Sequence, residues 1–204
     1  MSALDFKSLK KDFRNSVLKK TLGLVQSDVQ NFSQSISQSI VQFLTNQLFV
    51  SELTQKKIWA AFLPLKSEPQ IDFKAIQETF SDKIEFVFPQ VEGQNLAFFS
   101  QVNQWKMSSL GVQEPANGQK VSLNTISGFF IPAVAFHTQG YRLGRGLGFY
   151  DRALESFHGL KIGVSYQNNI LNDVPFEDHD ICMDYIITNK QILKIQKNIE
   201  IGDI

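Results

Sequence analysis

Apolar residues recur at helical spacing along the first fifty positions. Between residues 5 and 22 they stand three or four positions apart, at Phe6, Leu9, Phe13, Val17 and Leu18. Basic residues fill other positions there, which predicts an amphipathic helix. The same spacing returns over residues 27–48 among Ser and Gln, and Ser27 followed by Asp28 predicts an N-cap. We therefore expect two consecutive N-terminal helices.

Beyond residue 57 the pattern changes to short apolar runs separated by polar helical segments, which is typical of an α/β sheet. We predict strands at 58–65, 84–88, 96–102, 128–136, 160–166 and 185–188, and helices at 72–80 and 150–157. The run 129–136 is nearly all apolar and predicts a strand covered on both faces. The stretch 108–124 predicts a mobile loop. We expect one three-layer α/β/α domain, residues 1–204, with a mixed, largely parallel sheet.

Composition narrows the class of protein. The 204 residues include 20 Lys or Arg, 20 Asp or Glu and one Cys. A formal net charge of zero gives no general attraction to nucleic acid or to an anionic membrane. No apolar run approaches the roughly 20 residues that span a bilayer, and the charged N-terminus lacks a signal-peptide core. We expect a soluble cytoplasmic protein that binds neither nucleic acid nor membrane.

One segment, RLGRGLGFYDR beginning at Arg142, places glycines and arginines between a predicted strand and a predicted helix. Glycines at 144, 146 and 148 would let backbone N–H groups converge on an anion, and Arg142 and Arg145 would add charged donors. The spacing is neither that of a P-loop nor Gly-x-Gly-x-x-Gly. The segment predicts a phosphate cradle and leaves the reaction open; the alternative is a glycine-rich turn with solvated arginines.

This segment also resembles the signature of the 5-formyltetrahydrofolate cyclo-ligases, also called 5,10-methenyltetrahydrofolate synthetases. The resemblance rests on 142–152, preceded by 132–136 and Gly140, and it is long and specific. Weaker resemblance extends over most of the chain, at Lys10–Arg14, Phe62–Glu68, the Gly-x-x-Glu-Pro turn Gly111–Pro115 and Asp178–Thr188. The family's Rossmann-like topology agrees with the alternation of elements. His137 departs from the Asp of many members, and Phe149 from a more usual Tyr.

The resemblance implies an enzyme that uses ATP and Mg²⁺ to close 5-formyltetrahydrofolate into 5,10-methenyltetrahydrofolate, with release of ADP and phosphate. In the family the formyl oxygen attacks the γ-phosphate, and N10 then attacks the activated carbon. Such catalysis depends on alignment and charge neutralisation. Arg145 would be the catalytic residue. The implied ATP contacts are Lys10, Arg14, Arg142, Leu143, Gly144, Arg145, Gly146, Leu147, Gly148, Phe149 and Tyr150.

The resemblance further implies folate contacts from Leu63, Glu68, Phe149 and Tyr150, and Mg²⁺ ligands Asp151 and Asp184. The residues alone leave other interpretations open. Lys10 and Arg14 also fit a solvated basic helix face, and Glu68 a loop glutamate before a proline. Asp151 also fits an acid interacting with a helix dipole, and Asp184 a polar residue at the start of a strand.

Two other functions remain open. The first is a binding module for folate or nucleotide that has lost turnover, which His137 would permit. The second is an ATP-dependent enzyme acting on another formyl- or amide-bearing metabolite, because the phosphate loop is better marked than the substrate pocket. We expect a monomer whose partners are the small molecules 5-formyltetrahydrofolate and ATP.

Overall fold

The computed structural model describes residues 3–49, 56–80, 83–109, 111–177 and 180–196. The strands of its main sheet are β1 Lys57–Ala60, β2 Ile84–Glu92, β3 Asn95–Ser100, β6 Gln119–Val121, β7 Ile126–Pro132, β10 Leu160–Val164, β12 Tyr185–Ile187 and β13 Ile192–Lys194. They lie in the order β13-β12-β10-β7-β1-β2-β3-β6. Strands β12, β10, β7, β1 and β2 are parallel neighbours, and β13, β3 and β6 extend the two sides antiparallel. The predicted mixed, largely parallel sheet is confirmed.

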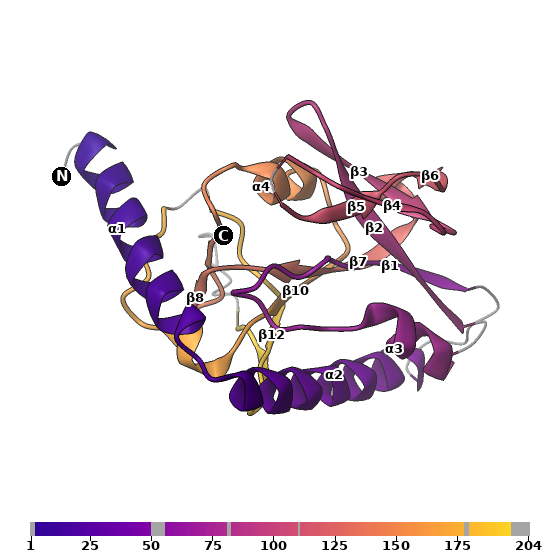
Figure 1. The fold of residues 1–204 in the computed structure, drawn as a ribbon, viewed down its shortest axis with the longest axis horizontal. Coiled ribbons are helices and arrows are strands. Elements are labelled where there is room, and N and C mark those ends of the chain that lie inside the picture. The colour runs from indigo at the N-terminus through magenta and orange to yellow at the C-terminus, as the bar shows by residue number, and fades with distance from the viewer. Residues whose placement is uncertain (1–2, 50–55, 81–82, 110, 178–179, 197–204) are drawn as a thin grey trace, which may run out of the picture.

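Helices cover both faces of this sheet. They are α1 Ala3–Leu22, α2 Gln26–Phe49, α3 Phe73–Phe80 and α4 Phe149–Leu154. Helices α2 and α3 lie along one face (Figure 1), where Ile40 and Phe73 join a core with Trp59 and Phe130. On the other face Leu154 of α4 joins a second core. The three-layer arrangement is confirmed, with α4 as the helix of the thinner layer.

Helix α1 stands apart from both layers, at one side of the molecule (Figure 1). Its apolar face is short: Val17 is buried, and Phe13 and Leu18 pack against the same small core, which includes Val134 and Leu143. The predicted amphipathic helix is therefore confirmed. Its apolar face rests on the segment that leads into the glycine-rich loop.

The predicted strand 128–136 divides into two strands. Strand β7 ends at Pro132, and β8 covers Ala135–His137. Strand β8 belongs to a separate small sheet with β9 Arg142–Leu143 and β11 Ile170–Leu171. The apolar run 129–136 is buried throughout, so its hydrophobicity predicted burial correctly and concealed the change of sheet.

Other boundaries also differ from the predictions. Ser27 lies inside α2, which begins at Gln26, so the predicted N-cap is wrong. The stretch 108–124 contains β5 Gln113–Pro115, paired with β4 Trp105–Met107, and also β6, so it is not one long loop. Short 3₁₀ helices cover Leu123–Thr125 and Gln167–Asn169. The remaining predicted elements are present with shifted ends. Among the described helices, none combines the length and the apolar character needed to cross a membrane.

Candidate functional site

A cavity of about 270 Å³ opens where β1 and β7 end. Leu63 follows β1 and Ala133 follows β7, and both line this central cavity. Ligands of open α/β sheets bind at this carboxyl edge. An apolar wall comes from the antiparallel side of the sheet and the β4–β5 hairpin, with Pro89, Val91, Leu96 and Val112. The facing wall is polar and contains Arg142, Gly144, Arg145, Gly146, Leu147, Gly148, Phe149, Tyr150 and Asp151.

Two of the three glycines of the polar wall have backbone conformations that other residues rarely adopt. Gly146 has φ +90° and Gly148 has φ +70°, and Gly148 immediately precedes α4. A Cβ at Gly148 would stand 2.6 Å from Nη1 of Arg152. Glycine therefore lets the backbone turn sharply and face the cavity without side chains, as the predicted phosphate cradle requires.

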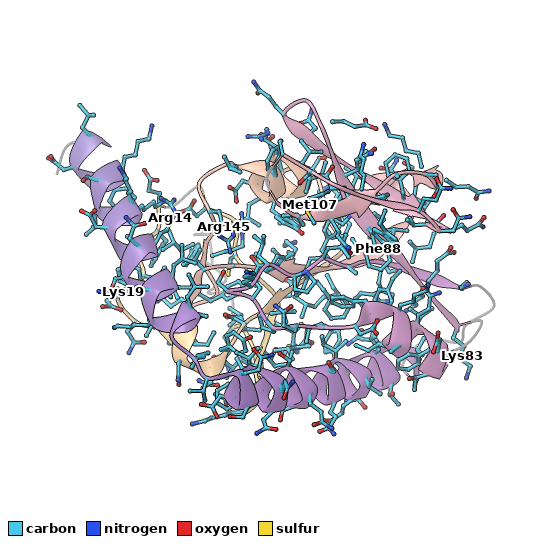
Figure 2. All side chains as sticks on the ribbon, in the orientation of Figure 1. Arg14, Lys19, Lys83, Phe88, Met107 and Arg145 are labelled. Atoms are coloured by element: carbon cyan, nitrogen blue, oxygen red, sulfur yellow. The ribbon has the colours of Figure 1, made fainter. Side chains whose placement is uncertain are left out.

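Arg14 reaches this loop from α1. Its Nε donates to the carbonyl oxygen of Gly144 at 2.7 Å. Figure 2 shows Arg14 extending from α1 toward the part of the molecule that holds Arg145. Burial and the charge of Arg142 lower the pKa of Arg14, while Asp151 and Asp180 oppose this shift. Arg14 and Arg142 thus stand together at the loop, where the family resemblance implies that both contact ATP.

Arg142 and Asp151 form an ion pair across the start of α4. The Arg142 side chain is 7% exposed and its guanidinium lies 5.5 Å from the centre of the Tyr150 ring. Burial, aided by the negative charge of Glu68, raises the pKa of Tyr150 although Arg142 opposes the shift. Tyr150 therefore keeps its hydroxyl proton at neutral pH and presents an aromatic ring to the cavity.

Arg145 connects the glycine loop to the segment after β1. Its Nε lies 3.3 Å from Oε1 of Glu68, and its Nη2 donates to Oγ of Ser67 at 2.5 Å. The second carboxylate oxygen of Glu68 accepts the Leu65 N–H at 3.0 Å. Burial raises the pKa of Glu68, while the Leu65 N–H and Arg145 act in the opposite direction. Arg145, which is expected to contact phosphate, is thus hydrogen-bonded to Glu68, which is expected to contact folate.

Three predicted ATP contacts do not line the cavity: Arg14, which reaches the loop at Gly144, and also Lys10 and Leu143. Lys10 donates to Glu177 at 2.9 Å and to Asp180 at 2.8 Å, and it does not line the cavity. Leu143 is 1% exposed, and its side chain packs in the small core with Val17 and Val134. Its backbone pairs with Ala135 of β8. Of the predicted folate contacts, Leu63, Glu68, Phe149 and Tyr150 all line the cavity.

The two carboxylates expected to share a metal ion lie apart. Asp151 lines the cavity at the carboxyl edge, whereas Asp184 precedes β12 and accepts the N–H of Lys161 at 2.8 Å, near the start of β10. Amino ends of parallel strands lie at the opposite edge, so Asp184 is separated from the cavity by the sheet. Two acids, Asp151 and Asp180, lie close enough to Arg14 for their charges to raise its pKa. The preceding residues 178 and 179, part of the resembling segment, lie outside the described ranges.

His137, the departure from the family pattern, supports the turn before the cradle. Its Nε2 lies 2.8 Å from the Asn172 carbonyl oxygen, and its Nδ1 accepts the Gln139 N–H at 3.1 Å. The ring also lies 4.8 Å from Phe176. His137 does not line the cavity, so its effect falls on anchoring of the turn.

The sequence did not assign Glu114 to the site. It lies in β5, is 7% exposed and lines the cavity. The Gly-x-x-Glu-Pro turn was its signal, but the turn alone does not reveal that β5 packs beside β2 to form a cavity wall.

Comparison with known proteins identifies the family. The model of the 5-formyltetrahydrofolate cyclo-ligase family matches residues 7–189. The chain belongs to this family. A cyclo-ligase of Mycoplasma genitalium is 29% identical over 160 residues, covering 77% of this chain and 84% of that protein. One of Mycoplasma pneumoniae is 28% identical, covering 89% of this chain and 99% of that protein.

Solved structures agree with the family assignment. The 5,10-methenyltetrahydrofolate synthetase of Aquifex aeolicus superposes with a TM-score of 0.75 at 27% identity, covering 96% of this chain and 97% of that one. The Mycoplasma pneumoniae synthetase gives 0.71 at 27% identity, covering 88% and 98%. The similarity to these cyclo-ligases therefore covers the whole α/β fold and not the glycine loop alone.

Proposed function

We propose that this protein is a 5-formyltetrahydrofolate cyclo-ligase that consumes ATP in the presence of Mg²⁺. The single observation that carries the proposal is the two-sided central cavity. One wall is a glycine loop beside three arginines, Arg14, Arg142 and Arg145, and the other is apolar. A triphosphate suits the first wall and a flat heterocycle suits the second. Membership of the family supplies the reaction.

The polar wall would bind the triphosphate. Gly146 and Gly148 have no side chains that would keep phosphate oxygens away from the backbone N–H groups of the loop. Arg14 and Arg142 are fixed by Gly144 and Asp151, so their charges stand at the loop before ATP arrives. Such preorganisation stabilises charge without reorganisation during the reaction. Lys10 would contact ATP only by leaving Glu177 and Asp180.

Asp151 fits a Mg²⁺ site of the kind that relies on substrate phosphates. Mg²⁺ usually takes one or two protein carboxylates and completes its octahedron with phosphate oxygens and water. Within the described ranges no three His, Cys, Asp or Glu side chains gather as a complete protein cage. The Asp151 side chain is 56% exposed and lines the cavity, and its ion pair with Arg142 uses Oδ1, so Oδ2 could serve as one such ligand. Bound Mg²⁺ would neutralise charge on the phosphates. Asp184 lies at the start of β12, at the edge of the sheet opposite the cavity, and we do not assign it to this Mg²⁺ site.

The reaction couples two displacements. The formyl oxygen attacks the γ-phosphorus, and the bond from phosphorus to the ADP oxygen breaks. N10 then attacks the formyl carbon and loses its proton, and the carbon–oxygen bond breaks to release phosphate and leave the methenyl cation. Arg145 would stabilise the charge on the transferring phosphoryl group, because it stands in the polar wall and already contacts the folate-side residues Ser67 and Glu68.

The test is to incubate the purified protein with 5-formyltetrahydrofolate, ATP and Mg²⁺ and to follow methenyl-folate absorbance. We expect product only when ATP is present and a stoichiometric release of ADP. Folate and ATP binding without product would favour a binding module instead. ATP hydrolysis that responds to another formyl or amide compound, and not to the folate, would move the assignment to a different substrate.

A further inference from the structure

The central cavity contains a second buried carboxylate, Glu114, that the mechanism above does not use. Glu68 and Glu114 are the charged residues among the buried polar side chains of the described chain, with 5% and 7% exposure. Both line the same cavity. On β5 Glu114 stands between the exposed Gln113, which also lines the cavity, and the buried Pro115.

The two carboxylates differ in what they bind. Glu68 accepts the Leu65 N–H and pairs with Arg145. Across the part of the chain that the structure describes, no hydrogen bond or ion pair reaches the Glu114 carboxylate, although Lys106 stands opposite it in the β4–β5 hairpin. Burying a carboxylate without a partner costs free energy, so such a group marks a place where a ligand supplies the partner.

The Glu114 oxygens also keep some contact with solvent. In the described chain, the buried polar side-chain atoms that lack both a partner and contact with solvent are Nε1 of Trp59 and Oγ of Ser165. The Glu114 oxygens are not among them, although the residue as a whole is 7% exposed. Glu114 is also one of the residues that line the central cavity.

The position of Glu114 is fixed by its hairpin. Gln90 of β2 donates from Nε2 to the Pro115 carbonyl oxygen at 2.8 Å, one residue after Glu114. Trp105 of β4 packs edge-on against Phe88 of β2 at 5.3 Å between ring centres. The hairpin that carries Glu114 is therefore held against β2, and Glu114 takes no part in the ion pairs of Arg142 and Arg145.

We propose that Glu114 is a second folate-recognition residue, which accepts a hydrogen bond from an N–H group of the reduced folate. This inference rests on the proposed function. A carboxylate repels the phosphates of ATP, whereas the N–H groups of a reduced pterin and of N10 are donors suited to it. Each oxygen of Glu68 already has one partner within the protein, whereas the Glu114 carboxylate has none in the described chain and offers both of its oxygens as acceptors.

The test compares Glu114→Ala and Glu114→Gln with Glu92→Gln as control. Glu92 is an exposed glutamate of β2 that pairs with Lys120 at 2.6 Å and does not line the cavity. We measure KM for folate and for ATP, and the Kd of 5-formyltetrahydrofolate by calorimetry without ATP. For Glu114→Ala we expect folate KM and Kd to rise about 10-fold to 100-fold, the range of a hydrogen bond to a charged group. ATP KM should not change.

Glu114→Gln keeps an acceptor oxygen, so its loss of folate affinity should be smaller than that of Glu114→Ala. Its thermal midpoint should equal or exceed the wild-type value, because the substitution removes a buried unpaired charge. Glu92→Gln should match wild type in every kinetic measurement. If Glu114→Ala unfolds at a lower temperature than wild type, the thermal comparison will show it. The folate affinity of Glu114→Gln then decides the question.

Three outcomes overturn the inference. Wild-type turnover with unchanged folate KM and Kd in Glu114→Ala would refute it alone. A raised Mg²⁺ or ATP requirement with unchanged folate affinity would make Glu114 a nucleotide-side residue instead. Wild-type protein that neither binds nor converts 5-formyltetrahydrofolate would refute the proposed function, and the inference with it.

Discussion

Replacing Arg145 with Ala should damage stability and activity through separate interactions. Arg145 is the cation beside Glu68, whose side chain is 7% exposed. Breaking a buried ion pair typically costs about 3–5 kcal/mol, because it leaves a buried charge unpaired. Here the Arg145 side chain is 36% exposed and the atoms are 3.3 Å apart, so solvent already screens the pair. Leu65 would also still donate to Glu68. We therefore expect a loss of about 1–2 kcal/mol.

Urea unfolding of four proteins measures this loss: wild type, Arg145→Ala, Glu68→Gln and the double variant. The double variant should regain most of the stability lost by Arg145→Ala, because the unpaired carboxylate is gone. A chain of this size should show a thermal shift of about 2–4 °C per kcal/mol. Turnover should behave differently. Removing a cation from a transferring phosphoryl group costs about 10³-fold or more, and Glu68→Gln would not restore it.

Either of two results would refute this reasoning. If Arg145→Ala unfolds at the wild-type urea midpoint, the pair with Glu68 contributes no stability. If the double variant regains turnover together with stability, Arg145 acts by holding Glu68 and not by stabilising charge on phosphate. The slope of the unfolding curve with urea should stay the same in all four proteins, because a changed slope would mean that compactness had changed.

Three further predictions follow from the site. Gly148→Ala should destabilise the protein by about 1–3 kcal/mol in thermal unfolding, because Ala must adopt φ +70° there; an unchanged midpoint would contradict this. Asp151→Asn should raise the Mg²⁺ concentration needed for half-maximal turnover, whereas Asp184→Asn should leave it unchanged; equal shifts would show that both are ligands. Burial raises the pKa of Glu68, so the folded protein holds this proton more tightly than the unfolded chain. Wild type should therefore lose stability relative to Glu68→Gln as the pH rises from about 4.3, the ordinary Glu value, through the folded pKa; a constant difference would exclude this.

Features fixed by local chemistry were predictable from the sequence. The two long helices follow from apolar spacing alone, and the glycine-rich loop was recognised from its alternating glycines, of which Gly146 and Gly148 have positive φ angles. The placement of Asp184 was not predictable in this way. The resemblance implied that the acid before the strand 185–188 is a metal ligand. In the structure this acid lies at the start of a parallel strand, at the edge of the sheet opposite the cavity. Asp180, four residues earlier, is the acid near Arg14.

Glu114 shows a different limit. Its strand has three residues, and the segment around it is rich in polar residues and glycine, so periodicity predicted a loop. Its burial comes from packing of the β4–β5 hairpin beside β2, about 25 residues away in sequence, where Gln90 bonds to Pro115. Contacts of this kind depend on tertiary structure and leave little local signal.

The contrast between the two walls of the cavity has a physical origin. An anion is held by consecutive backbone N–H groups and adjacent side chains, so one contiguous segment from Arg142 to Asp151 supplies nearly all of the polar wall. A flat ring must be enclosed from opposing sides, and its wall draws on four separate segments, 62–68, 89–96, 112–114 and 132–133. The proposed phosphate site is therefore concentrated in one motif, whereas the proposed folate site draws on Phe149 and Tyr150 of that motif and on segments dispersed along the chain. Folate recognition is therefore best tested by substitutions in these separate segments, beginning with Glu114.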